Sequence, residues 1–426
     1  MKETASTSEI VIPPEKATSK VQRLKQFIKA FGPGFITASV VLGPGSIAVS
    51  SRIGSQYGYI FIWVVVLAAI CMCVFVSMAV RYGILNQESI LQSIRTKYGR
   101  WFALGIGVSS FIAASSFQFG NNLGIGIGMQ GITGIPERVW PFVFTFLAFL
   151  LLYRAKNLYK VLEKIMIGLV ILMVLAFFAN LIFANPDLGA AAQGFIPRSE
   201  AFGKIEVIAA MIATTFAING AIYQAYLVQE KKVKIKNLRS SLTDSYTGIF
   251  FLALISILII STSAAALYPK GITVTSAAEM ASQLESLFGG SAKIIFSLGL
   301  CAAAFSSLMV NAVIGGGLIS DSLGLGNNMQ EKYPKIFTSI ILLLGMIIAV
   351  FYSGDAIYAL MIAQAATLVA VPLITLGMFL IANNPGLMGK YVNSRLQNII
   401  AVIGFVLIMI IMYSLFNMLL TYLGVN

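Results

Sequence analysis

Eleven apolar runs, separated by short polar connections, dominate this sequence of 426 residues. A run of about 20 apolar residues can cross the hydrocarbon core of a bilayer as an α-helix. Only 11% of the residues are charged, against roughly a quarter in soluble domains. We therefore expect an all-α polytopic membrane protein, surrounded by the lipid bilayer, with about 11 transmembrane helices at 33–56, 59–80, 102–128, 139–153, 160–184, 205–228, 246–268, 293–318, 335–352, 356–382 and 398–423.

The distribution of Lys and Arg fixes the expected topology. If eleven spans are assumed, 23 of the 29 basic residues lie on the side of the N-terminus and 6 lie on the other side. A single missed span would reverse the side of every later loop, so the bias supports this count. The sequence predicts a cytoplasmic N-terminus and an outside C-terminus in the cell membrane. The net charge of +13 then reflects topology, and no nucleic-acid partner is expected.

Two of the runs are interrupted near their middle. The first contains Gly43-Pro44-Gly45-Ser46, in which Pro44 removes a backbone donor and the glycines weaken the helix. The sixth contains a polar cluster that lipid would not tolerate unless it lines a cavity, formed by Thr214, Thr215, Asn219, Gly220 and Gln224. We expect this helix to unwind near Asn219-Gly220.

The spacing of these breaks predicts an inverted repeat. Five spans that begin with a broken helix are followed by five more that begin with a second one, which is the pattern of secondary transporters with a substrate site between the unwound segments. The expected divisions are a cytoplasmic tail at 1–30, a first repeat at 31–184, a second repeat at 205–382 and an additional helix at 398–423.

The first span and its surroundings resemble the Nramp (natural resistance-associated macrophage protein) family. The stretches that carry the strongest resemblance are Gly32-Pro33-Gly34-Phe35-Ile36-Thr37-Ala38, Gly43-Pro44-Gly45-Ser46, Gly54-Ser55-Gln56-Tyr57-Gly58-Tyr59 and Trp63-Val64-Val65-Val66. Weaker likeness lies at Ile222-Tyr223, Ser306-Ser307, Gly315-Gly316-Gly317, Val371-Pro372-Leu373 and Asn383. The resemblance implies the LeuT-type five-plus-five fold and proton-coupled import of divalent metal ions.

The sequence departs from that family at its metal ligands. The family's first-helix motif is Asp-Pro-Gly-Asn, and Gly43 and Ser46 replace its two ligands here. The family's Met-Pro-His motif of the sixth helix falls near Ile218-Asn219-Gly220, so the thioether and the imidazole are also missing. The chain thus resembles a divergent, Nramp-related branch.

The remaining polar residues form an uncharged candidate site. No Asp or Glu lies in the interior of a predicted span, and Glu163, Glu206, Asp244 and Asp321 fall at span ends, where we expect solvated helix termini. Backbone carbonyls near Val41 and Leu42, with the metal-ligand candidates Ser46, Asn219 and Gln364, could still coordinate an ion. Such a neutral set favours a monovalent or a still-hydrated cation over tightly bound Mn²⁺ or Fe²⁺.

The same breaks could instead bind an anionic group. Helix N-termini at Gly45-Ser46 and at Gly220 offer free N–H groups to a substrate carboxylate. The expected substrate-binding residues, for either kind of substrate, are Gly43, Gly45, Ser46, Thr215, Asn219, Gly220 and Gln364.

Resemblance to the related sodium symporters implies a possible Na⁺ site made of the Val41 and Leu42 carbonyls with Ser306 and Ser307. The two serines could equally serve close helix packing. Likewise, Gln118, Asn121 and Asn122 could line the permeation path or join helices, and Asn180 and Asn311 are more typical of structural roles.

Two function classes therefore remain open. The first is a secondary transporter for a metal cation, and the alternative is Na⁺- or H⁺-coupled uptake of a small organic solute such as an amino acid or carboxylate. No nucleotide loop, catalytic triad or cofactor motif is present, so we expect neither an enzyme nor a bound cofactor. The sequence determines neither the oligomeric state nor the direction of transport.

Overall fold

The structure is a computed structural model that describes residues 43–154 and 186–422, together with 168, 171–172, 174–179 and 181–183. The predictions for the tail at 1–30, for Val41 and Leu42, for Asn180 and for most of the fifth span lie outside the described residues.

The described residues form helices and connecting turns. The long helices are α3 (Pro44–Tyr57), α4 (Ile62–Leu85), α5 (Ile90–Tyr98), α6 (Arg100–Thr133), α7 (Trp140–Arg154), α11 (Ile205–Thr215), α12 (Ile218–Glu230), α13 (Leu238–Ala266), α16 (Ala292–Leu323), α17 (Lys332–Phe351), α18 (Ala356–Ala366), α19 (Val371–Ala382) and α21 (Arg395–Tyr422). One-turn helices fill the connections: α9 (Leu188–Gln193), α10 (Ser199–Phe202), α14 (Ala277–Ser282), α15 (Glu285–Phe288) and α20 (Pro385–Met388), with the 3₁₀ segments η1 (Glu137–Val139), η2 (Ile235–Asn237), η3 (Tyr268–Lys270), η4 (Gly289–Ser291), η5 (Thr367–Ala370) and η6 (Gly389–Tyr391).

The predicted all-α membrane fold is confirmed. Within the described part of the chain, 8 segments are long and apolar enough to cross a membrane, and each coincides with a predicted span. Helix α7 coincides with the fourth predicted span, at 139–153, but has only 15 residues. Helix α5 is an addition that the hydropathy did not predict, and the Ser89 side chain caps it by accepting the Gln92 N–H.

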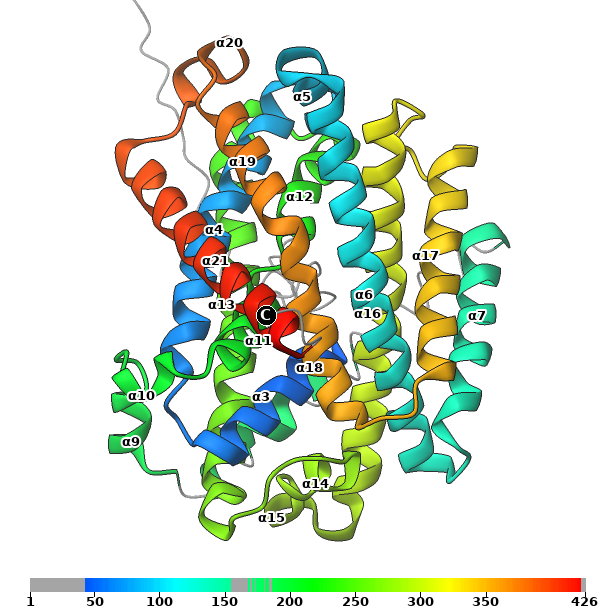
Figure 1. Cartoon of the computed structure of the whole chain (residues 1–426), viewed down its shortest axis with the longest axis vertical. Helices are drawn as coiled ribbons and strands as arrows, with labels where there is room; N and C mark the ends of the chain where they lie inside the picture. Colours follow the sequence, from blue (N-terminus) through cyan, green and yellow to red (C-terminus); the bar gives the residue numbers. More distant parts are fainter. Residues whose placement is uncertain are drawn as a thin grey trace, which may run out of the picture.

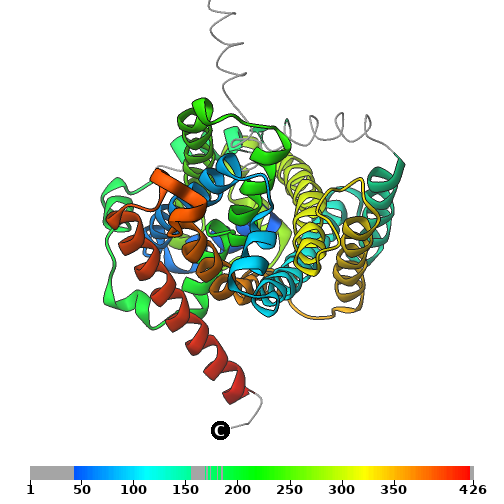
Figure 2. The ribbon, with the colours of Figure 1, turned by 90° about the horizontal axis from the view of Figure 1, so that it is seen from above.

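The helices pack as two groups, with α18 between them (Figure 1). In one group, α6 and α16 lie side by side along most of their length and both contact α17. In the other group, α12 and α13 pack on α4, and α13 also packs on α3. Seen from above, α21 projects away from this body beyond α4 and α19 (Figure 2).

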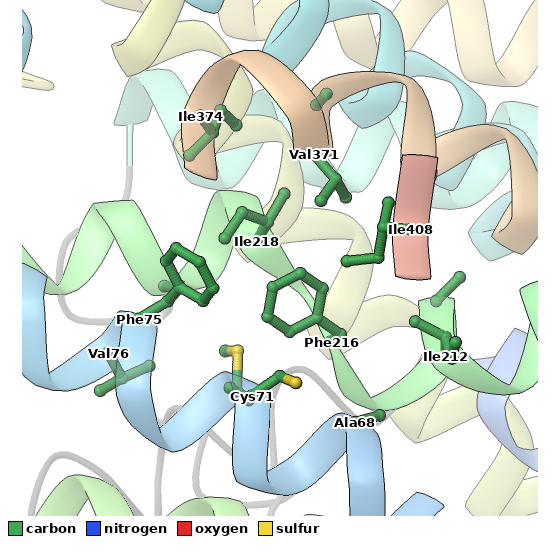
Figure 3. Packing of buried hydrophobic residues seen from close by; sticks show 14 of the residues in the cluster. Ala68, Cys71, Phe75, Val76, Ile212, Phe216, Ile218, Val371, Ile374 and Ile408 are labelled. Carbon is green, nitrogen blue, oxygen red and sulfur yellow. The ribbon is translucent and has the colours of Figure 1, made fainter. Parts of the chain in front are cut away.

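The non-helical residues of the sixth span, Phe216 and Ala217, pack against the hydrophobic core. Phe216 lies between α11 and α12, and its ring packs edge-on against Phe75 of α4 with 5.6 Å between ring centroids. Ile212 and Ile218 flank it, and Val371, Ile374 and Ile408 reach the same region from α19 and α21 (Figure 3). Packing of Phe216 therefore holds the interrupted segment in place from the side of α4.

Glycines allow the closest helix approaches. A Cβ atom added at Gly54 of α3 would lie 2.4 Å from the Ile260 carbonyl oxygen of α13, which is backbone and cannot swing away. Small residues at such crossings are typical of membrane helices, because dispersion contacts rather than the hydrophobic effect hold those helices together.

We expect Gly54→Ala to destabilise the protein by about 1–3 kcal/mol, because the added methyl group forces α3 away from α13. Thermal unfolding in detergent measures this. Gly290→Ala is the matched control, because a Cβ there meets nothing within 4 Å. Equal melting temperatures for the two variants would contradict the proposed packing.

Candidate functional site

The described part of the first span begins at the predicted break. Gly43 is extended, with φ −88° and ψ 171°, and α3 starts at Pro44. A Cβ on Gly43 would lie 3.1 Å from both the Phe117 ring and the Ser307 hydroxyl. The extended backbone therefore sits directly against α6 and α16.

The break in the sixth span lies slightly earlier than predicted. Phe216 and Ala217 are the non-helical residues, whereas Asn219 and Gly220 belong to the first turn of α12. The Asn219 side chain donates a hydrogen bond to the Ser110 carbonyl of α6 at 3.1 Å, so it bonds to a neighbouring helix and not within α12. A helix start leaves N–H groups unpaired in any case, so polar and glycine residues are tolerated there.

The two breaks meet. The Ser46 hydroxyl in the first turn of α3 donates to the Thr214 carbonyl near the end of α11 at 3.5 Å. Thr215, fully buried, ends α11. The juxtaposition expected of the two repeats is therefore present.

A third interruption, which the sequence analysis did not predict, lies in the tenth span. The helix changes to the 3₁₀ segment η5 between α18 and α19. Pro372 is the signal that could have indicated it, because a proline inside a helical run removes one hydrogen bond and clashes with the preceding turn. A stretch of 3₁₀ helix within a longer helix often marks a functional hinge.

Gln364 lies at the end of α18, against the first break. A Cβ on Gly45 would lie 2.1 Å from Gln364 Nε2, so only glycine leaves room for this side chain. Gln364 is 2% exposed, and its Oε1 has no hydrogen-bond partner among the described residues. Further out, the Arg52 guanidinium of α3 pairs with the Asp355 carboxylate at 3.4 Å, so α3 and α18 are joined at two points.

A cavity of about 40 Å³ opens beside the break in the sixth span. Its walls come from α6, α11, α12, α16 and η5, and they consist of Ala113, Phe117, Ala213, Phe216, Ala217, Ile218, Asn219, Gly220, Ser307, Val310, Asn311, Ile314 and Thr367. All of these residues are uncharged. The cavity therefore lies beside one of the two breaks between which the inverted-repeat pattern predicts a substrate site.

Of the predicted site residues, Asn219, Gly220 and Ser307 line this cavity. Gly43, Gly45, Ser46, Thr215 and Gln364 lie one layer away, at the junction of α3 with its neighbours, and Ser306 is buried in α16 without lining the cavity. Whether any of these residues binds a substrate or Na⁺ stays a prediction. The sequence did not predict that Phe216, Ala217 and Thr367 line the cavity. The break in the sixth span was expected three residues later, and the break in the tenth span was not expected.

Oxygen atoms are the available ligands. Asn219 Oδ1 is buried and has no hydrogen-bond partner within the described ranges. Asn311 uses its Nδ2 to donate to the Ala114 carbonyl at 2.9 Å. In the part of the chain that the structure describes, no three His, Cys, Asp or Glu side chains come together in a way that could hold a metal ion. The cavity can therefore offer a cation neutral oxygen ligands.

Gln118 of the third span joins two helices, and the side chains of Asn121 and Asn122 donate hydrogen bonds within α6. Gln118 donates to the Leu308 carbonyl of α16 at 2.8 Å, and Asn121 donates to Gln118 Oε1 at 3.1 Å. Asn122 donates to the Gln118 carbonyl at 2.9 Å. None of the three side chains lines the cavity, which favours a structural role over a role in the permeation path.

One prediction about acidic residues is wrong. Asp321 was expected at a solvated helix end, but α16 continues to Leu323 and the side chain is only 5% exposed. Its carboxylate accepts a hydrogen bond from the Tyr226 hydroxyl of α12 at 2.6 Å. Tertiary contact with a neighbouring helix, which hydropathy does not report, buries this group.

The sequence model of a family described as "Natural resistance-associated macrophage protein-like" matches residues 34–417. The chain belongs to this family. Its relatives include a "Divalent metal cation transporter MntH" of Yersinia pestis, 24% identical over 390 residues that cover 90% of this chain and 93% of the relative. Another transporter of that name, from Erwinia tasmaniensis, is 26% identical over 86% of this chain and 88% of its own length.

Solved structures share the fold. A manganese transporter of Eremococcus coleocola superposes with a TM-score of 0.73 at 16% identity, over 97% of this chain and 90% of its own. Mhp1, a nucleobase-cation-symport-1 family transporter, superposes with a TM-score of 0.56 at 12% identity, over 89% of this chain and 92% of its own. The Nramp-family fold, with its LeuT-type architecture, is therefore confirmed.

If the cavity binds a cation, Asn219→Ala will weaken binding about tenfold, because it removes a buried, otherwise unpartnered oxygen. A ligand that binds only the folded state raises its stability, so the loss corresponds to about 1.4 kcal/mol less stabilisation at saturating Mg²⁺. The rise in melting temperature on adding Mg²⁺ measures it. Asn237→Ala, at an exposed asparagine, is the control. An unchanged rise in Asn219→Ala would exclude this oxygen as a ligand.

Proposed function

We propose that this chain is a secondary transporter that carries a divalent metal cation across the membrane through an uncharged site. The observation that carries the proposal is the cavity beside the break in the sixth span, whose described walls consist of apolar side chains and neutral side chains that carry oxygen. Membership of the family and the names of its relatives support a metal cation over an organic solute.

The chemistry of the cavity favours a hard cation that keeps part of its water shell. A divalent ion stripped of water needs several ligands, usually with negative charge among them, and the cavity walls that the structure describes supply no charged side chain. The cavity, with a volume of about 40 Å³, is large enough to hold water beside an ion. Mg²⁺ gives up its water reluctantly and prefers oxygen ligands, so it fits this site better than softer metals do.

An organic solute is the weaker alternative, because the relatives that were named above are metal cation transporters. Ser307, which lies between Gly43 and the cavity, remains our proposed contact for a coupling ion.

We also propose an N-terminus in the cytoplasm and a C-terminus outside the cell membrane, with no enzymatic activity. The basic residues support this orientation, because α5, the C-terminal end of α12 and α20 lie at one end of the molecule (Figure 1). Arg95, Lys97, Lys231 and Lys390 belong to or adjoin these elements, as the positive-inside rule expects of cytoplasmic segments.

Reconstituted protein should take up Mg²⁺ faster than empty vesicles, and Asn219→Ala should reduce that rate about tenfold while Asn237→Ala leaves it unchanged. The reason is the loss of one neutral ligand in a site that has no charged ligand to compensate. Uptake into proteoliposomes loaded with a Mg²⁺-sensitive dye measures it.

The assay is repeated with Mn²⁺, Fe²⁺ and Ca²⁺, and with a panel of amino and carboxylic acids. Uptake at the empty-vesicle rate for all four metals would refute the proposal. Uptake of an organic acid, with none of any metal, would establish the alternative.

A further inference from the structure

Asp321 and Arg81 are the buried charged residues of the described helices, at 5% and 6% exposed. Arg81 is fully engaged, because its guanidinium donates to the carbonyls of Ser77 and Tyr391 and to the Asn393 side chain. Asp321 is different. Within the described residues its carboxylate forms no ion pair, and its partners are the hydroxyls of Tyr226, at 2.6 Å, and Ser89.

Burial of a carboxylate without a neutralising cation is unfavourable, and such a group relieves the cost by taking up a proton. The charged neighbours of Asp321 do not remove this tendency. Arg95 of α5 directs its guanidinium against Gly324, and Glu331 lies against Gly326 in the following loop. Glu88 before α5 and Tyr82 of α4 are further titratable groups near this cluster.

The contact joins α12 and α16, two of the helices that line the cavity. Tyr226 lies seven residues after Asn219 in α12, about 10 Å along the helix, and Asp321 lies ten residues after Asn311 in α16, about 15 Å along it. Between the cavity and this contact, the ring of Tyr223 stacks on Tyr226 with 5.5 Å between centroids. Tyr223 also approaches Gly317, where a Cβ would come within 3.7 Å.

We propose that Asp321 is a proton-binding site that controls the contact between the C-terminal ends of α12 and α16. When Asp321 is ionised, the Tyr226 hydroxyl donates a charge-assisted hydrogen bond to it and holds the two ends together. When Asp321 takes up a proton, this bond loses its charge assistance and weakens. Acidification then allows α12 to separate from α16 on the side of the cavity that lies opposite the Arg52–Asp355 pair.

The proposal rests on the proposed transport function, and the test has one readout that does not. Mg²⁺ uptake is measured at equal pH inside and outside the vesicles, from neutral to mildly acidic, for the wild type, Asp321→Asn, Tyr226→Phe and the control Glu230→Gln. Glu230 is an exposed carboxylate at the end of the same helix as Tyr226. In parallel, the infrared carbonyl band of protonated carboxyl groups is followed through the same pH range in purified protein.

We expect wild-type and Glu230→Gln uptake to rise at least threefold on acidification. Asp321→Asn and Tyr226→Phe should reach the faster rate already at neutral pH and lose the pH dependence. The infrared band that grows on acidification should be absent from Asp321→Asn and present in Tyr226→Phe, which also guards against a misfolded Asp321→Asn variant.

An identical infrared titration in the wild type and in Asp321→Asn would overturn the proton site. If uptake by Asp321→Asn and Tyr226→Phe still depends on pH, the proposed weakening of the α12–α16 contact by protonation is wrong. If the wild type takes up no metal, the proposed function fails, and the infrared comparison alone supports or overturns the proton site.

Discussion

Unpaired backbone groups at membrane depth are the constraint on which this structure depends. The start of α3 at Pro44 and the interruption at Phe216-Ala217 leave N–H and C=O groups without helical partners, and lipid offers none. The molecule shelters them by placing the breaks side by side, where Ser46 bonds to the Thr214 carbonyl. Two helix groups then enclose this pair, and α18 and η5 close the remaining side.

The cavity is uncharged because the described residues at and around the sixth-span break carry no charged side chain. The described cavity walls present amide, hydroxyl and carbonyl oxygens and no charged side chain, so they do not offset the charge of a fully dehydrated divalent ion. The buried carboxylate of the described helices, Asp321, stands apart from the cavity and bonds to Tyr226 instead. The buried carboxylate and the cavity are thus separated along α16.

Sequence patterns predicted the features that follow from local composition. Apolar runs located the spans, and Gly43-Pro44 located the first break, because proline and glycine act on the helix that contains them. Features that depend on contacts between helices could not be predicted from the sequence pattern. The second break falls at Phe216, which has no breaking tendency but packs into the core against Phe75. Asp321 lies beyond an apolar run, and only the approach of α12 buries it.

The most direct test of the account replaces Gly43 with aspartate and compares uptake of Mn²⁺ with uptake of Mg²⁺. Gly43→Asn is the control, because it has nearly the same size and no charge. If the missing carboxylate sets the preference, Gly43→Asp alone will raise the ratio of Mn²⁺ to Mg²⁺ uptake about tenfold, equivalent to about 1.4 kcal/mol. Equal ratios in the wild type, Gly43→Asp and Gly43→Asn would contradict the account.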